Sequence, residues 1–221
     1  MNKLSKPLAI ISDMDGTIVD SEKFAKTVWR AAAEAMGIDV PEAIYNEMVG
    51  SSVEKTNSLF TDFFGEDFAI DQLRALKTEI ELSSYGKGLI HEKEGATDFL
   101  TFIKDKKIPL GLATTTERFR ADKRLIESGL IKFFDFTLCG DEVEKQKPDP
   151  EMYLAVAKNL NVPIESCLVI EDSFSGVSAG VASGAQTVWI KDFLEIPEDL
   201  KKKVVQIESL ISLKAQIEST L

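Results

Sequence analysis

The chain has 221 residues, of which 44% are hydrophobic and 29% are charged. This is enough apolar material for one substantial core with a modest second domain beside it. The apolar run at residues 8–11 is too short for a signal peptide or a membrane span, and Asp13 follows it closely. We therefore predict a soluble, cytoplasmic protein with no membrane partner.

The formal net charge is −11, and the longest basic run covers only residues 201–203. Nucleic-acid phosphates require a positive protein surface, so this charge balance argues against nucleic acid as a partner. An acidic protein that handles an anionic ligand has to make its site locally positive with a cation, a few lysines or backbone N–H groups.

The two cysteines and the one histidine do not indicate a metal or redox site. Cys139 and Cys167 lie in apolar, strand-like stretches without paired ligand spacing, which predicts buried structural thiols. His91 has no second histidine with which to form a zinc site, so we predict that it is solvated and has no functional role.

After residue 20 the pattern is helical only. Hydrophobic spacing predicts helices at about 22–36, 41–50, 51–64 and 71–83. Gly37 suits the end of the first helix, and Ser51 with Glu54 forms a capping box at the start of the third. A Tyr-Gly-Lys-Gly joint at 85–88 closes the segment. Residues 21–86 are therefore predicted to form an inserted helical domain.

The rest of the chain alternates strand and helix. Short apolar runs predict strands at 8–12, 109–113, 134–139, 167–170, 187–190 and 204–207. Amphipathic stretches predict helices at 96–106, 118–128, 150–160 and 174–183, with a final helix after the last strand. Right-handed crossovers then give a doubly wound, Rossmann-like α/β core with a parallel sheet, formed by residues 1–20 and 87–221.

Polar residues follow several of the predicted strands. Ligands of such sheets bind beyond the carboxyl ends of the strands. Asp13 follows the first strand and Thr114 the second, while Glu171 and Asp172 follow the strand at 167–170. Lys147 lies in the loop before the helix at 150–160. Carboxylates gathered at one sheet edge repel each other unless a hard cation joins them. This arrangement predicts a Mg²⁺ site.

Each of these features also has a simpler structural interpretation. The Asp-Met-Asp-Gly-Thr string at 13–17 could be a plain turn after a strand, and an isolated lysine is usually solvated. Gly176, Gly180 and Gly184 recur at helical spacing, which favours close helix-to-sheet packing over a phosphate loop. Three phenylalanines of the helical segment, which resembles a cap domain as described below, are interpreted as its core residues: Phe60, Phe63 and Phe64.

Taken in order, these motifs resemble those of the haloacid dehalogenase-like superfamily. The resemblance covers nearly the whole chain and points to the β-phosphoglucomutase-like branch of small-molecule phosphatases and mutases. It is carried by the motifs at 13–17, 112–114, 147–150 and 171–173, the last continuing to Gly176. The helical segment resembles the cap domain of that branch.

The resemblance implies a covalent mechanism with Mg²⁺ as cofactor. Asp13 would attack phosphorus, and Asp15 would protonate the departing oxygen and then activate water against the aspartyl-phosphate. Asp13 and Asp172 would ligate the metal through their side chains, Asp15 through its backbone carbonyl, and Glu171 as a further contributor.

The remaining core motifs would contact the phosphoryl group. Thr114 would donate its hydroxyl to a phosphoryl oxygen, helped by N–H groups of the turn at Thr115, and Thr17 is a further candidate substrate contact. Thr115 and Thr116 also suit a plain helix start. Lys147 would offset negative charge on both the nucleophile and the transferring group.

The cap segment departs from the mutase pattern. Ala25 stands where the mutase has a histidine that gates proton transfer, and Val49 and Val53 flank the loop where the mutase carries basic residues. The loop itself supplies candidate contacts to the leaving group, although a helix end followed by a helix start explains them equally well: Gly50, Ser51 and Ser52. In the core, Ser12 replaces an apolar aromatic without altering the chemistry.

Three functions fit these features. The first is a phosphatase of small phosphorylated metabolites, such as sugar phosphates or phosphoglycolate. The alternatives are a sugar-phosphate mutase and a non-catalytic binding module on the same fold. Haloacid dehalogenation is disfavoured because it needs neither a second aspartate nor a metal. The residues fix neither the metabolite nor the oligomeric state.

Overall fold

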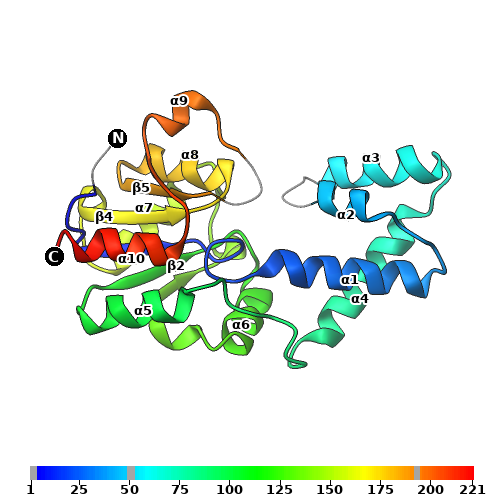
Figure 1. Ribbon diagram of the computed structural model, residues 1–221, viewed down its shortest axis with the longest axis horizontal. Coiled ribbons are helices and arrows are strands. Elements are labelled where there is room, and N and C mark those ends of the chain that lie inside the picture. Colours follow the sequence, from blue (N-terminus) through cyan, green and yellow to red (C-terminus); the bar gives the residue numbers. More distant parts are fainter. Residues whose placement is uncertain (1–3, 49–52, 192–194) are drawn as a thin grey trace. The chain divides into compact units, whose positions relative to one another are not determined.

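The computed structural model describes residues 4–48, 53–191 and 195–221, and the chain forms two compact units (Figure 1). One unit consists of Met1–Asp20 and Ile90–Leu221, and the other of Ser21–Leu89. We propose that the first is the catalytic core domain and the second the cap domain, with boundaries a few residues from those expected at 86 and 87.

The larger unit is built on a six-stranded parallel sheet in the order β3-β2-β1-β4-β5-β6. Its strands are β1 (Ala9–Ser12), β2 (Leu110–Ala113), β3 (Phe136–Leu138), β4 (Cys167–Glu171), β5 (Gln186–Ile190) and β6 (Val205–Ile207). The strand order reverses direction between β1 and β4, which is the switch point where ligands bind in doubly wound folds. The predicted α/β class is therefore confirmed.

Helices cover both faces of this sheet. They are α5 (Ala96–Asp105), α6 (Arg118–Glu127), α7 (Glu151–Asn159), α8 (Phe174–Ser183), α9 (Glu198–Lys201) and α10 (Leu210–Glu218). Helices α7 and α8 pack together on one face, and α5 packs with α10 on the other (Figure 1). Short 3₁₀ turns, which the periodicity did not predict, occupy Ile131–Phe133, Gly140–Glu142 and Ile164–Ser166.

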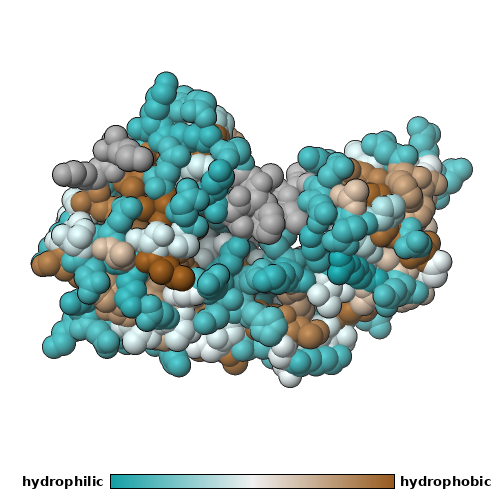
Figure 2. All heavy atoms as spheres, in the orientation of Figure 1, coloured by the Kyte–Doolittle hydropathy of each residue, from teal (hydrophilic) through white to brown (hydrophobic). Residues whose placement is uncertain are grey.

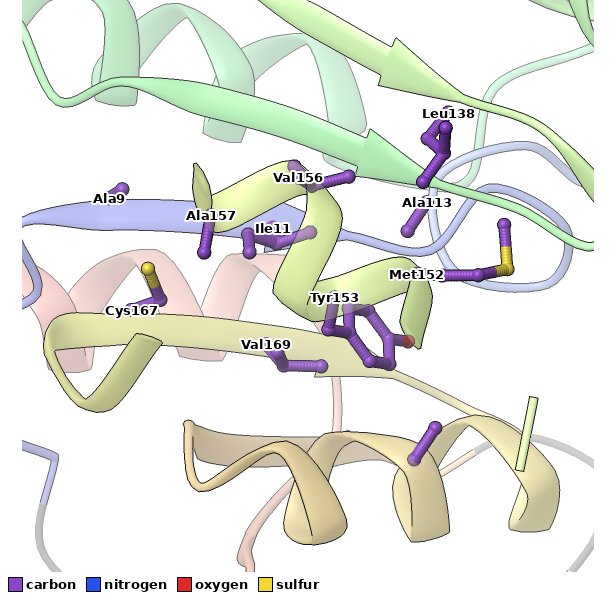
Figure 3. Packing of buried hydrophobic residues seen from close by; sticks show 11 residues of the cluster. Ala9, Ile11, Ala113, Leu138, Met152, Tyr153, Val156, Ala157, Cys167 and Val169 are labelled. Atoms are coloured by element: carbon purple, nitrogen blue, oxygen red, sulfur yellow. The ribbon is translucent and has the colours of Figure 1, made fainter. Parts of the chain in front are cut away.

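The core beneath α7 brings that helix against β1, β2 and β3 (Figure 3). Met152, Tyr153 and Val156 all point from one side of the helix toward the strands, where they meet Ile11 and Ala113. All five side chains are fully buried. Tyr153 is the polar member of this group, because its ring packs in the core while its hydroxyl needs a hydrogen-bond partner.

In the part of the smaller unit that the structure describes there are four helices, α1 (Ser21–Ala35), α2 (Glu42–Met48), α3 (Val53–Phe64) and α4 (Ile70–Ser84). Phe60 is fully buried at its centre and stacks on Trp29, Phe64 and Phe68. The cap-core prediction was right for Phe60 and Phe64 but wrong for Phe63, which is 54% exposed and makes a T-shaped contact with the Phe64 ring from outside the buried cluster. The predicted capping box involves Ser51, which lies outside the described residues.

Hydrophilic residues dominate the face of the molecule drawn in Figure 2, and hydrophobic residues appear there as separate patches. Within the described part of the chain, no helix combines the length and the apolar character needed to cross a bilayer. Lys202 and Lys203 of the basic run are exposed and follow α9, which ends at Lys201. Lys201 is partly buried and pairs with Glu195 and Glu198.

Candidate active site

Three carboxylates converge where β1 and β4 end. Asp13 follows β1, Glu171 is the last residue of the neighbouring β4, and Asp172 comes next. One oxygen from each carboxylate lies within 4.8 Å of the others, a spacing that would allow all three to hold one metal ion. Parallel pairing of adjacent strands is what brings together residues almost 160 positions apart.

Lys147 joins two of these carboxylates. Its Nζ donates to Oδ1 of Asp13 at 2.5 Å, to Oε1 of Glu171 at 2.7 Å and to the carbonyl of Ala113 at 2.9 Å. All three protons of the ammonium group are therefore used, and the side chain is only 2% exposed. The peptide bond between Lys147 and Pro148 is cis. The interpretation of Lys147 as a solvated surface lysine is excluded.

Burial and charge act together on these groups. Burial raises the pKa of Asp13 well above its ordinary value, Lys147 opposes this, and the neighbouring carboxylates Glu171 and Asp172 reinforce it. Burial alone would lower the pKa of Lys147, but the negative charges of Asp13 and Glu171 raise it well above its ordinary value. The same negative charges keep Lys147 in its charged form, and a further positive charge beside Asp13 would favour the ionised form of that carboxyl group.

Glu171 is fully buried, and five hydrogen bonds converge on its carboxylate. Oε1 accepts from Lys147 and, at 2.8 Å, from the hydroxyl of Tyr153. Oε2 accepts from the backbone N–H of Asp172, the backbone N–H of Ser173 and the Ser173 hydroxyl, each at 3.0 Å. The ring of Tyr153 also lies 5.0 Å from Nζ of Lys147. These contacts fix the position of the Glu171 carboxylate, which in turn holds the Lys147 ammonium group in place.

Two glycines make room for the carboxylates. A Cβ atom at Gly176 would overlap the Glu171 carboxylate, and one at Gly16 would overlap that of Asp172. Gly16 also has a φ of +81°, which side-chain-bearing residues rarely adopt. Close packing was predicted correctly for Gly176 and for Gly180, which abuts Thr187. It was wrong for Gly184, where a Cβ would meet nothing and the residue ends α8 in the left-handed conformation.

Asp15 lies in a second cluster of the same unit. Oδ1 receives a hydrogen bond from Nη1 of Arg124 at 2.6 Å, and Oδ2 receives one from the Thr116 hydroxyl at 2.7 Å. The Thr114 hydroxyl is farther from Oδ2, at 3.4 Å, and its oxygen accepts the N–H of Thr116. The helix-start interpretation of the threonines fails, because α6 begins later and its N-cap residue is Glu117.

Thr17 was predicted to contact substrate, yet its residue is 1% exposed and its hydroxyl donates to Oδ1 of Asp172 at 2.9 Å. The indole N–H of Trp189 donates to the Asp172 carbonyl. Both contacts orient Asp172, and we propose this positioning role for Thr17 in place of substrate contact. Ser12 is also buried, and its hydroxyl donates to the carbonyl of Asp13.

Other sequence-predicted candidates have different outcomes. Thr115 is exposed in the loop after β2, where its substrate role stays a prediction. Gly50, Ser51 and Ser52 lie outside the described residues. Cys139 and Cys167 are buried free thiols, as predicted, and burial raises their pKa to about 12 and about 11. His91 is exposed.

Sequence reasoning missed Tyr153, Arg124 and the side-chain role of Thr116. Tyr153 lies three positions after Pro150 in a helix whose inner face was predictable, so a hydroxyl on that face was the available signal. Arg124 offered no such signal, because its helix carries three arginines, Arg118, Arg120 and Arg124, that the sequence does not distinguish.

The donor set fits Mg²⁺. Carboxylate oxygens are its preferred protein ligands, and Asp13 and Asp172 present theirs next to each other. Glu171 fits less well as a direct ligand, because its oxygens already accept five hydrogen bonds. The two clusters together contain four carboxylates and two cationic side chains. A divalent cation would balance the remaining negative charge.

Comparison with known proteins shows the family of this chain. A family model of haloacid dehalogenase-like hydrolases matches residues 7–184. The chain belongs to this family. A phosphorylated carbohydrates phosphatase of Thermotoga maritima is 33% identical over 181 residues, which cover 82% of this chain and 83% of that protein. The chain is therefore a phosphatase of the haloacid dehalogenase-like type.

Two solved structures share the fold over nearly their full lengths. One, from Thermotoga maritima and provisionally assigned as a β-phosphoglucomutase, is 29% identical with a TM-score of 0.82, covering 96% of this chain and 99% of that one. The other is a CbbY variant of Rhodobacter sphaeroides in complex with xylulose-1,5-bisphosphate, 23% identical with a TM-score of 0.70, covering 94% and 96%. The second likeness shows the fold alone. The first likeness places the chain in the β-phosphoglucomutase-like branch.

Proposed function

We propose that this phosphatase is Mg²⁺-dependent and hydrolyses small phosphorylated metabolites, of the sugar phosphate or phosphoglycolate type, through an aspartyl-phosphate on Asp13. The observation that carries the proposal is the buried Lys147 ammonium held between Asp13 and Glu171, with Asp172 alongside. A buried cation against a carboxylate at the end of a central strand is costly as a structural device but useful for handling a phosphoryl group.

In this mechanism an oxygen of Asp13 bonds to phosphorus as the bond to the substrate oxygen breaks, and the Asp15 carboxyl proton passes to that oxygen. Water then attacks phosphorus as the bond between Asp13 and phosphorus breaks, a proton of the water passes to Asp15, and inorganic phosphate leaves the regenerated Asp13 carboxylate. Lys147 offsets the added negative charge throughout, and Thr114 donates to a phosphoryl oxygen. Mg²⁺, when bound, supplies positive charge to the phosphoryl oxygens and to Asp13.

Substrate selection is assigned to the cap, because the core residues recognise little beyond the phosphoryl group. The loop residues Gly50, Ser51 and Ser52 remain our candidates for contacts with the leaving group. Support for a phosphorylated sugar comes from the relatives, one named for phosphorylated carbohydrates and one solved with a sugar bisphosphate. A cytoplasmic location also remains our prediction.

Water, in this proposal, is the normal acceptor from Asp13. A mutase has to protect its aspartyl-phosphate from water and hold a second phosphate, which requires proton gating and basic cap residues. Ala25, Val49 and Val53 stand at those positions, and none of their side chains can donate a hydrogen bond. The mutase is therefore the second candidate.

The test is a screen of the purified protein with Mg²⁺ against sugar phosphates, phosphoglycolate and nucleotides, measuring inorganic phosphate. Asp13→Asn is expected to abolish turnover with the fold intact, whereas Asp98→Asn, the same change at an exposed residue of α5, is expected to have no effect. Asp13→Asn activity above about a tenth of wild type would exclude the covalent mechanism.

The same preparation decides between phosphatase and mutase. It is incubated with β-glucose 1-phosphate and a catalytic trace of the 1,6-bisphosphate while inorganic phosphate and glucose 6-phosphate are followed together. We expect phosphate release to dominate. Rapid formation of glucose 6-phosphate with negligible phosphate release would assign the chain as a mutase.

A further inference from the structure

We propose that Arg124 is a positioning residue for the general acid/base Asp15, and that it acts together with the Thr116 hydroxyl. The inference rests on the proposed function and deepens it. Arg124 belongs to none of the four sequence motifs, and it reaches the site from the last turn of α6.

The placement of Arg124 follows from how α6 packs. Ala121 and Leu125 are fully buried and fix the inner side of the helix. Arg124 is three positions after Ala121 and therefore lies on the same side, with its side chain 15% exposed. The helix thus directs the Arg124 guanidinium inward instead of into solvent.

The two contacts on Asp15 act on different oxygens. Nη1 of Arg124 donates to Oδ1 at 2.6 Å, and Oγ1 of Thr116 donates to Oδ2 at 2.7 Å. An aspartate side chain has two rotatable bonds, and contacts to both of its oxygens restrict both rotations. The Asp15 carboxylate is therefore held in one orientation, although its side chain is 26% exposed.

The other arginines of α6 show what a purely structural arginine does here. Arg118 binds Asp122 on its own helix, Thr137 in β3 and Glu142 after β3, which ties the helix to that strand and to the chain that follows it. Arg120 pairs with Glu117 one turn earlier on the surface. Arg124, in contrast, contacts a carboxylate to which the proposed mechanism gives the proton transfer.

Loss of Arg124 is expected to lower kcat by an amount that depends on the leaving group of the substrate. An alkyl alcohol has to receive the Asp15 proton as its bond to phosphorus breaks, so its departure depends on the orientation of that carboxyl group. A p-nitrophenolate leaves as the anion without a proton. General acid catalysis is worth about 10²- to 10⁴-fold, and a loosely held acid would lose part of that factor.

The experiment compares kcat for the best alkyl phosphate of the screen with kcat for p-nitrophenyl phosphate. For Arg124→Met we expect the ratio of alkyl to aryl kcat to fall about tenfold or more, with KM for the alkyl substrate nearly unchanged. Thr116→Val is expected to lower the same ratio, and Arg124→Lys to recover part of it. Arg120→Met, the same change on the same helix, is expected to leave the ratio at the wild-type value.

The outcomes separate the two proposals. Wild-type protein that hydrolyses neither substrate would overturn the proposed function and this inference with it. Active wild-type protein with equal losses on both substrates in Arg124→Met would overturn the positioning role alone. If Arg124→Met does not fold, as judged by circular dichroism, Arg124→Lys and Thr116→Val decide the question, and an unchanged ratio in both would overturn the inference.

Discussion

At the scale of single residues, the site depends on a buried network of charged groups in which Lys147 and Glu171 both have hydrogen-bond partners. Lys147 and Glu171 are both almost fully buried, and removing water from two charges costs free energy that their mutual attraction need not recover. The network is retained, we infer, because the same ammonium group contacts Asp13. The Tyr153 hydroxyl and the Ser173 contacts keep Glu171 from being an unsatisfied buried carboxylate.

The space for this network depends on Gly176. We predict that Gly176→Ala lowers both activity and stability, although alanine favours a helix by about 1 kcal/mol over glycine. The added methyl group would overlap the Glu171 carboxylate, which five hydrogen bonds hold in place. We expect a loss of roughly 1–3 kcal/mol, typical of overpacking, measured by denaturant unfolding alongside phosphatase assays.

Ser178→Ala on the same helix serves as the control for Gly176→Ala. Its hydroxyl binds only within the helix, to the carbonyl of Phe174, and we expect activity to be unchanged. A Gly176→Ala protein with wild-type stability and activity would show that Glu171 can move without consequence.

At the scale of elements, α6 is fixed to the segment after β3 by one arginine. Arg118 donates from Nε and Nη2 to the two oxygens of Glu142, and the Cys139 N–H also donates to Glu142. The hydrogen bonds from Arg118 lower the pKa of Glu142, and burial opposes this only in part. The helix that carries Arg124 is thereby held against the sheet.

This contact predicts a pH-dependent stability difference. Because the pKa of Glu142 is lowered in the folded protein, its contribution is complete above the unfolded pKa of about 4.3 and is lost as the pH falls through the folded pKa. We expect Glu142→Gln to lower Tm at pH 7 and to approach the wild-type Tm as the pH falls below about 4. Glu142 is 36% exposed, so solvent screening keeps the effect near 1 kcal/mol or about 2–4 °C.

Glu117→Gln is the matched control, because Glu117 pairs with Arg120 on the surface and is 52% exposed. Its Tm is expected to stay within error of wild type at both pH values. A Glu142→Gln deficit that persisted or grew at low pH would show that the ion pair is not its source.

At the scale of the whole molecule, an acidic chain has to bind an anion. The net charge of −11 repels phosphorylated metabolites over most of the surface, so binding depends on local positive charge. Lys147 alone cannot supply it, since Asp13 and Glu171 both contact its ammonium group. A divalent cation held by Asp13 and Asp172 would supply the local positive charge.

We therefore predict that EDTA silences the enzyme, that Mg²⁺ restores it and that Ca²⁺ inhibits it, because Ca²⁺ accepts looser, higher coordination that could tie up both oxygens of Asp13. Independently of activity, saturating Mg²⁺ should raise Tm. At a hundredfold excess of Mg²⁺ over its Kd, binding adds about 2.7 kcal/mol to the free energy of unfolding. Asp172→Asn is expected to lose this shift and Asp98→Asn to keep it. Full activity in excess chelator would contradict the metal requirement.

The sequence alone determined the helical and strand elements, the doubly wound class and the strand-end residues, because periodicity and strand-to-turn signals are local properties of the chain. Element ends moved by a few residues, as for the strand expected at 134–139, which shortened to Phe136–Leu138 where a 3₁₀ turn precedes it. The gathering of Asp13, Lys147 and Asp172 also followed from the chain, since parallel strand ends meet at one sheet edge.

Only the tertiary structure decided which other side chains reach these groups. Arg118, Arg120 and Arg124 are chemically identical and occupy one helix, yet they pair with Glu142, Glu117 and Asp15 because the helix's packing on the sheet sets the direction of each. The hydroxyl of Tyr153 reaches Glu171 for the same reason. A sequence pattern fixes which side of a helix is buried, whereas the partner at the end of a long polar side chain depends on distances that only the folded chain defines.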